Sequence, residues 1–105
     1  MQMRFDLIDG KNALRLRFAK GELLEMHEHT PSDYHDVVVV SGRVAVYGYG
    51  WHKEVKAGQM LLLTDDEMHH EIAALEPDTE VLNVYRSPMP SHTSKIGMGW
   101  LPAQR

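Results

Sequence analysis

The chain has 105 residues, which suits one domain with a single hydrophobic core. Its 43% hydrophobic and 25% charged residues are typical of a globular protein, and its net charge of -4 argues against a nucleic-acid partner. No apolar run approaches the ~20 residues of a membrane helix. The absence of cysteine excludes disulfides and thiolate metal sites. Because Asp6 interrupts the start, we expect no secretory signal and a cytoplasmic protein without membrane partners.

Most of the chain has the pattern of short β-strands. Leu14, Leu16 and Phe18 alternate with Arg15 and Arg17, which predicts a strand with its arginines in solvent. Further strands are predicted over residues 23–29, 37–40, 44–47, 51–55, 60–63, 68–73 and 81–85. The β-branched run Val37–Val40 predicts a strand buried on both faces. Turn signals every eight to twelve residues favour an all-β sandwich or barrel.

The last segment, residues 86–105, differs from the rest. Its prolines and glycines prevent a regular central strand, yet Ile96, Met98, Trp100 and Leu101 are too apolar for a free tail. We expect an extended C-terminal arm that packs over the barrel or onto a neighbouring subunit.

Histidine is the residue type that points to chemistry. His27 and His29 are one residue apart, so on a strand both point to the same face, and His35 and His69 arrive from other segments. Such an imidazole group can bind a divalent transition metal. His70 is expected on the face opposite His69, in solvent, and His52 and His92 are expected at the surface.

These histidines stand at fixed distances from glycines. Five residues separate Gly21 from His27, six separate His35 from Gly42, and the second group runs from Gly58 through residues 64–66 to His69. Residues 21–73 thereby resemble the two motifs of the cupin superfamily. The resemblance implies one all-β domain over residues 1–105, a double-stranded β-helix or jelly-roll barrel, with His27, His29 and His69 as metal ligands. The second motif departs from the family at Thr64, Asp66 and Ala73, where proline, glycine and asparagine are usual.

The fourth ligand of the family is usually glutamate, and here two positions compete. The count back from Gly42 gives His35, whereas the count forward from His29 gives Asp33. We prefer His35 because its count runs along a well-defined strand. Four neutral imidazoles leave the full charge of the metal uncompensated, which favours anionic ligands and a strong Lewis acid. The pattern does not distinguish zinc, nickel, iron, manganese and copper.

Two functions are compatible with this pattern. The resemblance implies a metalloenzyme that acts on a small oxygenated or anionic metabolite, of isomerase, lyase or dioxygenase type. The alternative is a cupin module that binds or senses a metal or small ligand without turnover. Glu25, Glu71 and Tyr34 are the candidates for proton transfer. We also expect a homodimer, formed through edge strands and the apolar arm.

Overall fold

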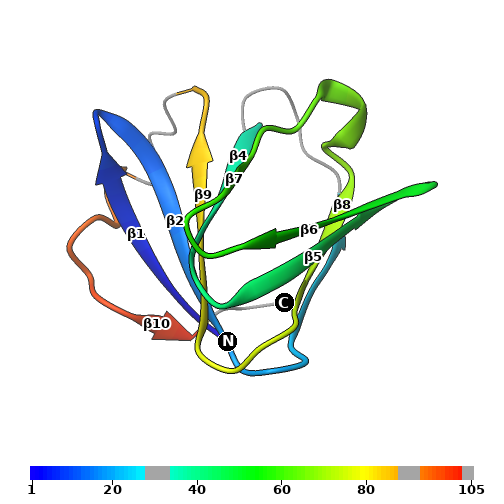
Figure 1. The fold of residues 1–105 in the computed structure, drawn as a ribbon. Coiled ribbons are helices and arrows are strands. Elements are labelled where there is room, and N and C mark those ends of the chain that lie inside the picture. Colours follow the sequence, from blue (N-terminus) through cyan, green and yellow to red (C-terminus); the bar gives the residue numbers. More distant parts are fainter. Residues whose placement is uncertain (28–33, 88–92, 103–105) are drawn as a thin grey trace.

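Two antiparallel sheets face one another and form the barrel (Figure 1). The computed structural model describes residues 1–27, 34–87 and 93–102, with the side chains of residues 25–27 outside that description. The six-stranded sheet has the order β10 (Leu101–Pro102), β1 (Gln2–Ile8), β2 (Lys11–Phe18), β9 (Thr79–Tyr85), β4 (His35–Ser41) and β7 (Met60–Leu61). The four-stranded sheet has the order β3 (Leu23–His27), β8 (His70–Ala74), β5 (Arg43–Gly48) and β6 (Trp51–Lys56).

The topology places segments from distant parts of the sequence side by side. β9 pairs with both β2 and β4, while β8 pairs with both β3 and β5. At one end of the barrel β9 ends and β4 and β8 begin, and we call this end the mouth; it is uppermost in Figure 1. The opposite end, where β2 and β8 end, is called the far end.

Alternating side chains fill the space between the sheets. Leu16 and Phe18, Val37 and Val39, Val44 and Val46, Ile72 and Ala74, and Val81 all belong to one buried cluster. Burying each of the larger side chains contributes roughly 1.5–3 kcal/mol. This period of two confirms the expected strands, and it determines which residues of each strand reach the interior.

The outer face of β4 differs from the expectation. Val37 and Val39 are fully buried, but Val38 is half-buried and Val40 is 43% exposed, so the strand is not buried on both faces. A β-branched run indicates a strand without indicating whether a second layer covers it. The predicted strand at residues 60–63 is also shorter, since β7 covers only Met60–Leu61, and β1 was not predicted.

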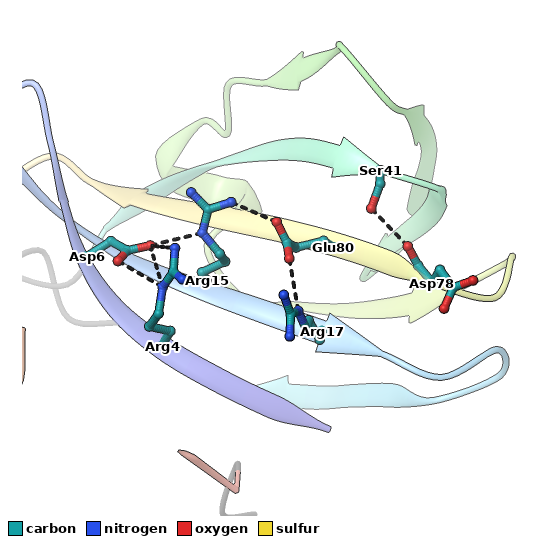
Figure 2. A network of polar contacts seen from close by, with 7 residues as sticks. All are labelled: Arg4, Asp6, Arg15, Arg17, Ser41, Asp78 and Glu80. Atoms are coloured by element: carbon teal, nitrogen blue, oxygen red, sulfur yellow. Dashed lines mark hydrogen bonds and ion pairs between the residues drawn. The ribbon is translucent and has the colours of Figure 1, made fainter. Parts of the chain in front are cut away.

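Charged side chains form a network on the outer face of the six-stranded sheet (Figure 2). The Arg15 guanidinium joins Asp6 at 2.9 Å and Glu80 at 2.7 Å, and Arg4 and Arg17 extend the network on either side. Burial disfavours ionisation of the two carboxyl groups, but the hydrogen bonds from the arginines outweigh it and lower the pKa of both Asp6 and Glu80. The arginines therefore face outward as predicted, although the Arg15 side chain is only 19% exposed.

The C-terminal arm packs on the barrel, as expected. β10 pairs with the edge strand β1, with Met3 opposite Leu101. The guanidinium carbon of Arg17 lies 3.7 Å from the centroid of the Trp100 ring, within the range of a cation–π contact. This contact ties the arm to the charged network.

Gly42 explains one of the spacings seen in the sequence. Its φ of 76° lies in the left-handed region, and a Cβ there would run into Thr79 at the start of β9. Gly21 also has a positive φ, of 84°, but a Cβ there would have open space. The glycine between β4 and β5 is thus required twice, by backbone conformation and by the close approach of another strand.

A 3-10 turn, η2 (Asp65–Glu67), precedes β8, and no helix among the described residues is long and apolar enough to cross a membrane. β6 forms an open edge of the four-stranded sheet, and His52, Lys53, Glu54 and Lys56 are exposed along it.

Candidate functional site

His35 is the first residue of β4 and points into the barrel. Its side chain is 1% exposed, and its register partner is Tyr85 at the end of β9. The two rings meet edge to face, with centroids 5.4 Å apart. The burial pattern of β4 continues inward at Val37 and Val39, so the apolar core fixes the direction of the imidazole.

His70 enters the same interior from the opposite sheet. It begins β8, and its side chain is fully buried. Its Nδ1 lies 2.9 Å from the carbonyl oxygen of Glu67 in η2. Because a carbonyl only accepts hydrogen bonds, Nδ1 carries the proton and the lone pair of the neutral ring is on Nε2.

The turn that holds His70 is itself well defined. Thr64 and Glu67 form a capping box in which the Thr64 amide donates to the Glu67 carboxylate at 3.0 Å. Lys53 contacts the same carboxylate at 2.7 Å, and this hydrogen bond is the main cause of the lowered pKa of Glu67. Glu67 therefore stays ionised and serves the turn.

The two imidazoles contact one another at the mouth. The centroids of His35 and His70 are 5.4 Å apart and their planes are inclined by 75°. We call these two residues the histidine pair. Two fully buried imidazoles in contact bring titratable ring nitrogens together at this end of the core.

The structure describes the backbone of one further predicted ligand near the pair, His27. His27 is the register partner of His70 in the β3–β8 ladder, which places the two backbone positions opposite one another. His29, Asp33 and His92 lie outside the described residues, as does the side chain of Glu25. Among the residues that the structure does describe, no three histidine or acidic side chains come together as a possible metal site.

The expectation for His70 is wrong. His69 and His70 do point to opposite faces, but His70 is the buried one, whereas His69 is half-buried with its ring 4.8 Å from that of Tyr49. The alternation of buried Met68, His70, Ile72 and Ala74 decides the face. The assignment of His69 as a ligand remains a prediction, and the burial pattern favours His70 in its place.

The sequence signal for His70 was available. Met68, Ile72 and Ala74 set the inward parity of this strand independently of any motif. A count from Gly58 missed it because the path between Gly58 and β8 includes the 3-10 turn η2, where strand parity does not apply.

Of the candidates for proton transfer, Glu71 and Tyr34 have side chains that the structure describes. Glu71 is the register partner of Tyr47, whose side chain is exposed, so it lies on the outer face of the sheet. Tyr34 is half-buried and packs against the hydrophobic core. His52 is exposed as expected, with its ring stacked on that of Tyr47. Tyr85, which sequence reasoning did not single out, contacts His35.

A buried amide lies one layer below the mouth. Asn83 is two residues before Tyr85 on β9, is 2% exposed, and has Val37 and Leu14 as register partners. Its Oδ1 has no hydrogen-bond partner among the described residues. The inner face of the six-stranded sheet is therefore polar near the mouth and apolar beyond it.

The barrel matches solved structures of low sequence identity. KdgF from Halomonas sp. superimposes with a TM-score of 0.65 at 22% identity, over 85% of this chain and 80% of that one. An RmlC-like cupin from Desulfovibrio desulfuricans gives 0.64 at 17% identity, over 82% of each chain. The chain has the cupin fold.

Another cupin comparison concerns a regulatory protein. The Cupin_2 domain of an XRE family transcriptional regulator from Enterobacter cloacae matches with a TM-score of 0.62 at 19% identity, over 75% of this chain and 83% of that one. No family model and no curated protein matches the sequence. At these identities the cupin comparisons describe the fold, and the predicted jelly-roll architecture is confirmed.

Proposed function

We propose that this cupin binds a divalent transition metal at its mouth, through His35 and His70 together with His27 and His29, and acts on a small oxygenated or anionic metabolite. The observation that carries the proposal is the histidine pair, two fully buried imidazoles from opposite sheets with ring centroids 5.4 Å apart. Neutral imidazole is the commonest side-chain ligand of such metals.

The donor set fits a metal in its chemistry. Histidines that bind metals generally donate their other ring N–H to a carbonyl or carboxylate, which fixes the ring and makes the binding nitrogen more basic. The contact of His70 Nδ1 with the Glu67 carbonyl has this form. The capping box at Thr64 and Glu67 holds that carbonyl in place.

A bound metal would polarise a carbonyl or carboxylate oxygen as a Lewis acid. The chain's own residues supply the surroundings. The buried ring of Tyr85 contacts His35, and the fully buried Val37 and Ile72 lie two residues further along β4 and β8. Electrostatic interactions are stronger at such a buried site than in water.

Elemental analysis of protein purified without chelator tests the proposal. We expect close to one equivalent of metal per chain, and its loss in His35→Ala and His70→Ala. His52→Ala is the matched control, because His52 is exposed and on the opposite side of its sheet. Protein that neither carries a metal nor takes one up on addition would refute the proposal, as would full retention in both core variants.

The alternative is a binding or sensing module, which the likeness to the cupin domain of a transcriptional regulator supports. Water-proton relaxation in the manganese-loaded protein separates the two. A coordination position open to exchangeable water is typical of catalytic sites, and a closed shell favours the sensing module.

A homodimer is part of the same proposal. Light scattering at micromolar concentration is expected to give twice the mass of the chain, and a monomer would contradict it.

A further inference from the structure

A cavity of about 350 Å³ opens at the mouth, and one of its lining residues, Tyr85, contacts His35. It lies at the top of β1, β2 and β9, and Lys11, Asn12, Tyr85, Arg86, Ser87 and Thr93 line it. We call it the mouth cavity. Its volume is at the lower end of the range for small-molecule sites.

The walls of the mouth cavity are built from the core outward. Asn12 and Tyr85 are both more than nine-tenths buried, and neighbouring register positions in the β2–β9 ladder bring them together. Ser87 and Thr93 add hydroxyl groups at the rim. The cavity therefore combines hydrogen-bonding groups held by the sheet with others at the surface.

The described lining of the mouth cavity includes two cationic side chains, Lys11 and Arg86, in a chain whose net charge is -4. Arg86 is fixed by the Asp36 carboxylate and the Leu63 carbonyl, so its guanidinium has a defined position. Arg86 is thus paired with a carboxylate, as the other arginines of the described chain are with Asp6, Glu80, Glu54 or Glu76, and Lys11 is the lining cation without such a partner among the described residues.

We propose that the mouth cavity is an anion subsite, in which Lys11 binds the carboxylate or phosphate end of a small organic ligand. The Asn12 side chain and the hydroxyl groups of Ser87 and Thr93 bind its oxygens. A lysine without a carboxylate partner, beside a cavity and in a protein of net charge -4, is suited to a ligand that brings its own negative charge.

The position of Tyr85 connects this subsite to the histidines. One side of its ring contacts His35, with centroids 5.4 Å apart, and the residue also lines the mouth cavity. A ligand anchored at Lys11 would thus extend past Tyr85 toward the histidine pair. This part of the inference rests on the proposed metal function and names its substrate class, a small organic anion.

The subsite is tested on metal-free protein. Backbone amide NMR spectra are recorded during titration with sodium malonate, with inorganic phosphate and with glycerol, at constant ionic strength. We expect saturable shifts at Lys11, Asn12 and Ser87 with one or both anions, and none with glycerol. Tighter binding of malonate indicates a carboxylate ligand, and tighter binding of phosphate indicates a phosphorylated one.

Three variants complete the test. Lys11→Ala should weaken anion binding by about tenfold or more, which is the usual effect of losing one charge-assisted hydrogen bond. Lys11→Arg should retain most of the affinity. Lys20→Ala is the matched control, because Lys20 is exposed at the far end. Unsaturable shifts, or equal affinity in wild type and Lys11→Ala, would overturn the inference.

Metal content measured on the same samples keeps the two proposals apart. We expect Lys11→Ala to retain the metal of the wild type. Anion binding at Lys11 in a protein that takes up no metal would refute the metal proposal alone. Anion binding that requires metal and ignores Lys11 would refute the subsite alone.

Discussion

The far end of the barrel has the larger cavity, about 520 Å³ against about 350 Å³ at the mouth. Its polar groups already have partners within the chain: Glu22 binds the Met1 ammonium at 2.8 Å, Arg17 pairs with Glu80, and the Ser41 hydroxyl donates to the Asp78 carbonyl. At the mouth, in contrast, the Asn83 Oδ1 has no hydrogen-bond partner and Lys11 has no carboxylate partner in the described part of the chain. Volume therefore says less about binding than the partners of the polar groups do.

The largest loss of stability is expected from a substitution in the tight packing at the far end. Gly42→Ala should lower the free energy of unfolding by about 2–4 kcal/mol, because it adds left-handed strain and a clash with Thr79. Gly21→Ala has the strain without the clash and should cost about 1–2 kcal/mol. Urea denaturation measures both. Equal losses would mean that the approach of Thr79 is unimportant.

We expect a metal bound at the mouth to stabilise the folded protein. A metal at one hundred times its Kd should stabilise the wild type by about 2.7 kcal/mol. His70→Leu should remove this stabilisation, since the buried imidazole that presents Nε2 is gone. Thermal unfolding with and without zinc or nickel measures it, with His52→Leu as the control. An unchanged metal-induced stabilisation in His70→Leu would count against the histidine pair.

The charged network that borders the far-end cavity gives a pH-dependent effect. Arg15→Met should cost about 1–3 kcal/mol at pH 7, because it leaves Asp6 and Glu80 short of a partner. The pKa values of both carboxyl groups are lowered in the folded state, so their stabilisation is full at neutral pH and is lost as the pH falls through those lowered values. The stabilities of the wild type and the variant should therefore begin to converge as the pH falls below about 4, and should meet only below the lowered pKa values.

The exposed pair of Arg43 and Glu54 is the control for that measurement. Arg43→Met should cost no more than about 1 kcal/mol at any pH, because solvent screens the pair. A stability gap between wild type and Arg15→Met that does not narrow at all between about pH 5 and about pH 2 would show that the arginine acts through packing rather than through charge.

Lys11→Ala should give the smallest change. Lys11 is exposed and has no carboxylate partner in the described part of the chain, so stability should shift by less than about 0.5 kcal/mol. Urea denaturation without added anion checks this. A larger loss would mean that the lysine stabilises the fold, and the mouth would then resemble the far end, where the polar groups serve the fold.

Much of the barrel follows from local pattern. Alternation in β2 and the β-branched residues of β4, β5 and β9 predict strands because side chains on a half-buried sheet must alternate. The first strand was not predicted, although Phe5 alternates with Arg4 and Asp6 over seven residues as in the other strands. The role of its charged residues becomes clear from the ion pair that Asp6 forms with Arg15 on β2.

The candidate site was less predictable. His35 follows from the parity of Val37 and Val39, which local sequence contains. The inward face of β8, in contrast, depends on where the strand begins, and η2 moves that point to His70. Tyr85 reaches His35, and β2 reaches β9, through pairings between strands far apart in sequence, and no local pattern specifies these.

The open edge of β6 has a consequence for association. An edge strand offers unpaired backbone groups to any strand that approaches, and charged side chains, lysine above all, are a common protection against this. Lys53, Glu54 and Lys56 lie along that edge. A strand added there would have to pair beside these charged side chains, which disfavours its addition. Lys53, which contacts Glu67 of η2, is thus also one of the charged residues that disfavour the pairing of another strand with β6.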